Sequence, residues 1–215
     1  MNYKAVIFDL DGTLVNSLED IADAMNTVLK NSHYPTHDYA AYNYFIGHGL
    51  LNLVSKAIPQ QHNNATEVNR CFEELMTVYS ENCVNKTKAY EGVNELLDTL
   101  KEKEIIVAIL SNKADVLTKK VVQKLFPDYF KIVIGLTTEE LKKPNPATAI
   151  QISTDLNMPV SQILYVGDSG VDMQTATNAN MHAVGVSWGF RPVMELQENG
   201  AKTTINTPLE LLELL

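Results

Sequence analysis

Short apolar runs recur along the chain and give the first indication of its architecture. They are rich in branched residues and show no alternation, which is typical of strands buried on both faces of a sheet. These runs occupy residues 5–8, 105–110, 132–135, 163–166 and 183–186, and Thr203-Thr204-Ile205 is a further, edge-like strand candidate. From residue 90 onward, segments of helical period separate them. This alternation predicts an open parallel sheet with helices on both faces.

Residues 16–83 have a different pattern. Apolar residues recur there at helical spacing in three segments, one after Ser17, one from Leu50 and one over residues 65–84. Ser17, with Asp20 three residues later, is a candidate helix cap. No strand is expected in this stretch, which is long for a single connection between strands. We therefore predict an α/β core domain of residues 1–15 and 84–215, with an inserted all-helical domain of residues 16–83.

Polar side chains follow several of the predicted strands where each strand ends. Asp9 and Asp11 follow the first strand, Ser111 and Asn112 the second, and Asp168 a later one. Ligands bind at the carboxyl ends of the strands in open parallel sheets, so these residues are expected to converge on one cleft. Paired carboxylates after a buried strand are costly unless a cation or a reaction needs them. One such aspartate alone would more often belong to a turn.

Composition narrows the class of protein further. The 215 residues are 45% hydrophobic and 20% charged, which is ordinary for a soluble globular chain. A net charge of −9 argues against general binding to nucleic acid or anionic membranes. Cys71 and Cys83 have no metal-ligand spacing, and no signal peptide or membrane span is visible. We expect a cytoplasmic protein, either a monomer or a weak homodimer.

Four motifs resemble, in order, those of the haloacid dehalogenase-like hydrolase superfamily, and their detail is similar to its phosphoglycolate phosphatase-like branch. They are Asp9-Leu10-Asp11-Gly12-Thr13, Ser111-Asn112-Lys113, Lys143-Pro144 and Gly167-Asp168-Ser169-Gly170-Val171-Asp172. The resemblance covers essentially the whole chain. It implies a Rossmann-like open parallel sheet core with an inserted all-helical cap domain. It also implies a phosphoric monoester hydrolase acting on a small phosphorylated metabolite.

The resemblance implies Mg²⁺ as the cofactor, a cation that prefers oxygen ligands. Asp9 and Asp168 would hold it with their side chains, and Asp11 with its backbone carbonyl. Asp172, one helical turn after Asp168, would orient a water or a ligand of the metal. Asp172 could instead be a first-turn residue favoured by the helix dipole.

The resemblance also assigns catalytic roles. Asp9 would attack phosphorus and form an aspartyl-phosphate, while Asp11 would protonate the leaving oxygen and then activate water. Ser111 and the backbone N–H of Asn112 would bind phosphoryl oxygens, and Lys143 would neutralise charge. Taken alone, Ser111-Asn112 could be a helix cap, and Lys142 could compete with Lys143. Proline directly after Lys143 favours Lys143.

Substrate and phosphate contacts are predicted for Gly12, Thr13, Asn112 and His48. His48 lies between two glycines in the helical insertion, where it could contact a carboxylate or sugar oxygen or could simply belong to a turn that starts a helix. We predict a Mg²⁺-dependent phosphatase, with phosphoglycolate as the leading candidate substrate. The alternatives are a β-phosphoglucomutase-like phosphomutase, an inorganic pyrophosphatase and a non-catalytic phosphoprotein-binding module.

Overall fold

A computed structural model of the chain describes residues 3–215; Met1 and Asn2, which the predicted core domain includes, lie outside them. Its centre is a six-stranded sheet in the order β5-β4-β1-β6-β7-β8, and every pair of neighbours is parallel. The strands are β1 (Ala5–Phe8), β4 (Ile106–Ala114), β5 (Ile132–Leu136), β6 (Ile163–Gly167), β7 (His182–Val186) and β8 (Thr203–Ile205). The predicted parallel sheet is confirmed, with β8 at an edge.

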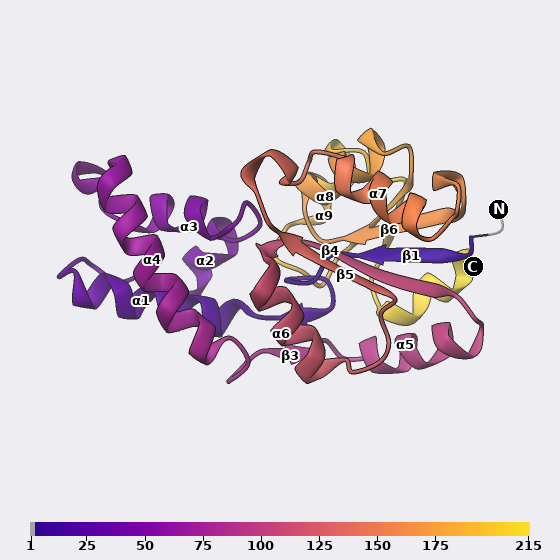
Figure 1. Cartoon of the computed structure of the whole chain (residues 1–215), viewed down its shortest axis with the longest axis horizontal. Helices are drawn as coiled ribbons and strands as arrows, with labels where there is room; N and C mark the ends of the chain where they lie inside the picture. Colours follow the sequence, from indigo (N-terminus) through magenta and orange to yellow (C-terminus); the bar gives the residue numbers. More distant parts are fainter. Residues whose placement is uncertain (1–2) are drawn as a thin grey trace.

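Helices cover both faces of the sheet, so β1 buries alternate side chains in two different cores. Val6 and Phe8 join the larger core, whereas Ala5 and Ile7 join the smaller one. In Figure 1, one set of helices lies above the strands and another below them. The first set is α7 (Ala147–Asp155), α8 (Gly170–Asn178) and α9 (Val193–Glu198). The second set is α5 (Val93–Glu102), α6 (Asp115–Leu125) and the 3₁₀ helix η4 (Pro208–Leu214).

The remaining helices gather at one end of the sheet, beside the carboxyl ends of the strands (Figure 1). They are α1 (Leu18–Asn31), α2 (Tyr39–Phe45), α3 (Leu50–Ala57) and α4 (Ala65–Asn82). All four fall within the stretch predicted to be helical. A short antiparallel ladder joins β2 (Val15–Asn16) to β3 (Lys88–Ala89), at the points where the chain leaves the sheet and returns to it. Short 3₁₀ turns complete the fold: η1 (Gln60–His62), η2 (Glu139–Leu141) and η3 (Val160–Gln162).

Two local predictions differ from the structure, and one alternative is excluded by it. Ser17 precedes α1, but its side chain makes no capping hydrogen bond. Asp20 instead accepts hydrogen bonds from the backbone N–H groups of Lys86 and Thr87, and so ties α1 to the returning chain. The reading of Ser111-Asn112 as a helix cap is wrong, because β4 continues to Ala114 and α6 begins after it.

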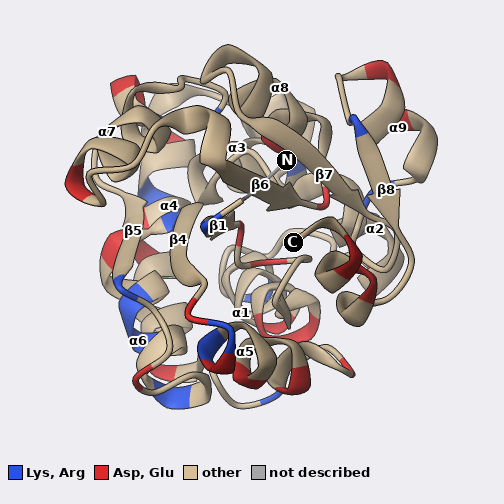
Figure 2. Cartoon of the chain, turned by 90° about the vertical axis from the view of Figure 1, so that its right-hand side faces the viewer, with Lys and Arg blue, Asp and Glu red and all other residues tan. Residues whose placement is uncertain are grey.

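Charged side chains lie both on the surface and in the interior. Acidic residues are spread over helices on both sides of the sheet (Figure 2). Charges of both signs are also buried, namely Lys113, Lys143 and Arg191 together with Asp9, Asp20, Asp168 and Asp172. None of the helices within residues 3–215 combines the length and apolar character needed to cross a membrane.

Candidate active site

The site begins at the carboxyl end of β1, where the chain makes a tight loop. The Asp9 backbone N–H donates to the carbonyl of Val166 at 2.9 Å, which holds Asp9 against the end of β6. Gly12 has a φ of +91°, and an added Cβ would lie 2.2 Å from the Asp168 Oδ2 atom. Only glycine accommodates both the backbone conformation and this close approach. The loop therefore brings the carboxylates of Asp9 and Asp168 together.

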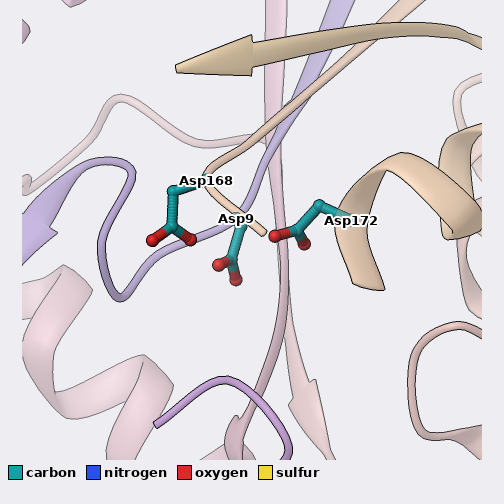
Figure 3. A group of neighbouring side chains, drawn as sticks. All are labelled: Asp9, Asp168 and Asp172. Atoms are coloured by element: carbon teal, nitrogen blue, oxygen red, sulfur yellow. The ribbon is translucent and has the colours of Figure 1, made fainter. Parts of the chain in front are cut away.

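Three buried carboxylates converge at this point. Asp9 follows β1, Asp168 follows β6, and Asp172 lies in the first turn of α8. Their side chains point toward a common region (Figure 3), and one oxygen from each lies within 4.8 Å of the other two. Residues more than 150 positions apart in the sequence thus form a single cluster.

Lys143 lies against two of the three carboxylates. Its Nζ atom donates to Asp9 Oδ1 at 2.8 Å and to Asp172 Oδ1 at 2.6 Å. The second oxygen of Asp172 accepts from the backbone N–H and the hydroxyl of Ser169, at 3.1 and 2.6 Å. Both oxygens of Asp172 are thus already hydrogen-bonded. Asp168 accepts through Oδ2 from the backbone N–H of Phe190, at 2.7 Å.

The clustered charges perturb one another strongly. Burial raises the pKa of Asp9 to about 7; the Asp172 charge adds to this rise, and Lys143 opposes it. Burial, followed by the charges of Asp172 and Asp9, also raises the pKa of Asp168 well above its usual range. Burial alone would lower the pKa of Lys143, but the carboxylates of Asp172 and Asp9 raise it well above its ordinary value. Lys143 is therefore a permanent cation in a region with an excess of carboxylates.

This set of donors fits a divalent cation. Asp9 and Asp168 are buried and repel each other, and the ammonium of Lys143, which contacts the cluster, reaches Asp9 and Asp172 but not Asp168. A cation bound among these carboxylates would stabilise their ionised forms and so offset the burial and mutual repulsion that raise their pKa values. All the side-chain donors are carboxylate oxygens, the ligands that Mg²⁺ and similar hard cations prefer. Because Lys143 and Ser169 engage both oxygens of Asp172, Asp9 and Asp168 are the better direct ligands.

A cavity of about 40 Å³ opens beside Asp9. One wall is polar and comes from the strand ends; it consists of Asp9, Asp11, Ser111, Asn112, Lys113 and Lys143. The opposite wall comes from the helical stretch and is aliphatic apart from backbone; it consists of Ile21, Ile46, Gly47, Gly49, Leu50 and Leu53.

Ser111 and Asn112 reach the cavity because β4 is irregular there. Its register with β5 shifts between Leu110 and Ala114. The Asn112 side chain accepts from the backbone N–H of Lys143 at 2.9 Å and donates to the carbonyl of Gly47 at 3.2 Å. Asn112 therefore braces both the Lys143 backbone and the loop on the opposite wall.

The structure brings most of the predicted site residues together. Five of them line the cavity: Asp9, Asp11, Ser111, Asn112 and Lys143. Lys142, the competitor of Lys143, pairs instead with Glu139 at 2.8 Å. Among the described residues, neither Thr13 nor His48 lines the cavity: Thr13 is buried, and the side chain of His48 is exposed. The glycines on either side of His48 take the place predicted for it.

Two buried cations were not assigned a role from the sequence. Lys113 lines the cavity and donates to the Asp11 carboxylate at 3.0 Å. Its position directly after Ser111-Asn112 is a signal that could have pointed to it. Arg191 donates to the backbone carbonyls of Asn43 and Ile46, so it joins the chain after β7 to the loop before α3. No sequence pattern marks Arg191.

Known proteins share both the sequence pattern and the fold of this chain. A family model described as haloacid dehalogenase-like hydrolase matches residues 6–186. A phosphoglycolate phosphatase of Chromobacterium violaceum is 29% identical over 99% of this chain and 96% of its own length. Another, of Haemophilus influenzae, is 30% identical over 99% and 98%. A solved structure from Lactobacillus delbrueckii subsp. bulgaricus superposes with a TM-score of 0.93, at 30% identity over 100% and 98% of the two chains.

Proposed function

We propose that this chain, which belongs to the haloacid dehalogenase-like hydrolase family and is a phosphatase, hydrolyses a small phosphorylated metabolite in the cavity beside Asp9. Phosphoglycolate is the leading candidate, because relatives aligned over nearly the whole chain are named phosphoglycolate phosphatases. The observation that carries the proposal is that Asp9, Asp11, Ser111 and Lys143 line one cavity, with Asp168 held against Asp9.

The roles of the residues follow from their positions. Asp9 attacks phosphorus, and the bond from phosphorus to the leaving oxygen breaks as the aspartyl-phosphate forms. Asp11, on the same wall, gives its proton to the leaving oxygen and later takes one from the water that attacks the aspartyl-phosphate. The net reaction consumes one water and yields an alcohol and phosphate. Ser111 and the backbone N–H of Asn112 hydrogen-bond the phosphoryl oxygens.

Charge has to be neutralised before a carboxylate can attack a phosphate dianion. Lys143 supplies one positive charge from within the chain, 2.8 Å from Asp9. A Mg²⁺ ion held by Asp9, Asp168 and the backbone carbonyl of Asp11 would supply the rest of the charge neutralisation. Asp172, fixed by Lys143 and Ser169, keeps this arrangement in place.

The aliphatic wall favours a small leaving group. Ile21, Ile46, Leu50 and Leu53 offer no hydrogen-bonding side chains. A sugar would bury hydroxyl groups against them, and each unpaired group costs about 1–3 kcal/mol. This argues for a short ester over the sugar phosphate that a phosphomutase needs. A two-carbon acid could reach the backbone of Gly47 and Gly49 with its polar end.

We further propose that residues 16–83 form a cap domain over a core of residues 1–15 and 84–215. Closure of the cap would exclude bulk water while the aspartyl-phosphate forms and would complete the aliphatic wall, leaving room only for the water that Asp11 activates. We also propose a cytoplasmic location, to which Cys71 and Cys83, both free thiols, are suited.

The test is phosphate release from phosphoglycolate, several sugar phosphates and pyrophosphate, with Mg²⁺ and with a chelator. We expect Mg²⁺-dependent release that is strongest for a short ester, and we expect Asp9→Asn to lower it by at least about a thousandfold. Circular dichroism would confirm that the variant is folded. Near-normal turnover by Asp9→Asn would contradict the assignment of the nucleophile. Preferential turnover of sugar phosphates or pyrophosphate would contradict the choice of substrate.

A further inference from the structure

Lys113 is a buried cation to which the proposed mechanism gives no task. It follows Asn112 near the end of β4, and only 1% of its side chain is exposed. Its Nζ atom donates to both carboxylate oxygens of Asp11, at 3.0 and 3.2 Å. Burying an ammonium group is costly unless its hydrogen bonds are satisfied. The contacts with Asp11 account for part of that requirement.

The remaining contact comes from the helical stretch. Lys113 Nζ donates to the hydroxyl of Tyr79 at 2.5 Å, and it lies 4.6 Å from the centroid of the Tyr79 ring. Tyr79 is on α4 and is fully buried. Within residues 3–215, the cavity wall takes side chains from α1 and α3 but none from α4. Helix α4 is therefore connected to Asp11 through Tyr79 and Lys113.

The charge states suit a fixed arrangement. Burial alone would lower the pKa of Lys113, but Asp11 and Tyr79 raise it above its ordinary value, so the ammonium persists. Burial raises the pKa of Tyr79, so its hydroxyl remains neutral and accepts from Lys113. A cation held between a hydroxyl on one side and a carboxylate on the other has little freedom to move.

We infer that Tyr79 is a positioning residue for the acid–base step, acting through Lys113 to fix the Asp11 carboxyl group against the leaving oxygen. This inference rests on the proposed function, in which Asp11 protonates that oxygen. In the structure Lys113 reaches both Asp11 oxygens; when one of them carries the proton, the ammonium keeps its hydrogen bond to the other. As the bond between phosphorus and the leaving oxygen breaks, the proton passes to that oxygen and Asp11 becomes a carboxylate paired with the ammonium. Helix α4 thereby helps to aim the acid without touching the substrate.

Leaving-group chemistry separates positioning of the acid from general structural support. An alkyl phosphate such as phosphoglycolate needs a proton on its leaving oxygen, because an alkoxide is a poor leaving group. Acetyl phosphate is a similarly small molecule, but it releases acetate, a stable anion that needs no proton. The value of kcat/KM reports the steps up to the first irreversible one, which is formation of the aspartyl-phosphate. A misplaced acid should therefore slow the alkyl ester selectively.

The experiment measures kcat/KM for acetyl phosphate and for the best alkyl phosphate of the panel, with Mg²⁺, in wild type and Tyr79→Phe. General acid catalysis contributes about 10²–10⁴-fold. We expect Tyr79→Phe to lower the alkyl ester value by about tenfold or more and the acetyl phosphate value by less than about twofold. Lys113→Met should show the same selectivity to a greater degree. The matched control is Tyr42→Phe, a buried tyrosine of α2 whose hydroxyl donates to Asn26; both of its values should stay near wild type.

The outcomes separate this inference from the proposed function. An equal loss on both substrates in Tyr79→Phe, or no loss on either, would overturn the positioning role while leaving the phosphatase assignment intact. Release of phosphate from neither substrate by the wild type would overturn the proposed function, and the inference with it.

Discussion

At the scale of single residues, the site is defined by an imbalance of buried charge. Asp9, Asp168 and Asp172 are clustered, and Lys143 contacts only Asp9 and Asp172 among them. Burial is the main cause that raises the pKa of Asp9 to about 7, and the nearby charge of Asp172 adds to the rise. Protons and metal ions therefore compete for the same carboxylates.

This competition gives a pH-dependent prediction. The pKa of Asp9 is about 3.9 in an unfolded chain and about 7 in the folded one. Without metal and between these two pH values, Asp9 is protonated in the folded chain and ionised in the unfolded chain. This bound proton stabilises the folded state, and the stabilisation is lost as the pH rises through 7. Below pH 7 a metal must displace that proton, at about 1.4 kcal/mol per pH unit. We expect the gain in Tm from Mg²⁺ to be larger at pH 8 than at pH 5.5.

Differential scanning fluorimetry with MgCl₂ or with a chelator would measure this gain. For a chain of this size, 1 kcal/mol corresponds to about 2–4 °C in Tm. Asp9→Asn is the control, because it removes one of the two titrating ligands and leaves Asp168, so it should weaken the pH dependence of the gain. A gain in the wild type that is the same at both pH values would contradict the competition.

At the scale of elements, the sequence predicts buried strands well and short, half-exposed elements poorly. Strands β1, β5 and β6 and the first five residues of β4 contain no charged or strongly polar side chain, so their pattern is unambiguous. Helix α2 has seven residues, and β2 and β3 have two residues each. Segments this short carry too little periodicity, so neither α2 nor the β2–β3 ladder was predicted. Site residues that directly follow strands, such as Asp9 and Asp168, could be found for the same reason that the strands could.

The rest of the site depends on packing that no local pattern records. Tyr79 fits the apolar face of α4, so the sequence gives no reason to separate it from core residues such as Leu75. Its contact with Lys113 requires α4 to dock beside β4, from 34 positions away in the chain. Arg191 follows a loop rather than a strand, and its partners are backbone carbonyls that have no residue signature.

Arg191 supports a second prediction at this scale. Its guanidinium donates to the carbonyl of Ile46 at 2.7 Å and to the carbonyl of Asn43. These two hydrogen bonds hold the loop that carries Gly47 and Gly49. Arg191→Met keeps much of the stem but leaves both carbonyls without this donor, and hydrogen bonds to charged groups contribute about 1.5–3 kcal/mol. We expect KM to rise about tenfold while kcat changes by less than about threefold.

Steady-state kinetics on the best ester would test this, together with amide hydrogen exchange of residues 46–50, which should become faster. The control is Arg70→Met, because Arg70 is a half-exposed arginine of α4 that pairs with Glu67 and Glu74 on its own helix. Unchanged exchange in Arg191→Met would show that the loop is held by other contacts.

At the scale of the whole molecule, the helical stretch and the sheet share one hydrophobic core. The larger cluster runs without interruption from Val6 and Phe8 on β1 to residues of α1, α3 and α4, including Met25, Leu53 and Leu75. A cap that had a separate core could unfold alone. Because these side chains lose their partners together, we infer that the stability of the helical stretch depends on the sheet.

The shared core predicts a single cooperative unfolding transition. Trp188 is the only tryptophan, and its Nε1 atom donates to the carbonyl of Thr13, so its fluorescence reports on the sheet side of the molecule. Far-UV circular dichroism reports on all the helices, including α1–α4. In urea without substrate, we expect the two probes to give coincident curves. If ellipticity were lost at a lower urea concentration than the Trp188 signal, the helical stretch would be shown to unfold on its own. The cap closure that we propose would then involve local unfolding as well as displacement of a folded unit.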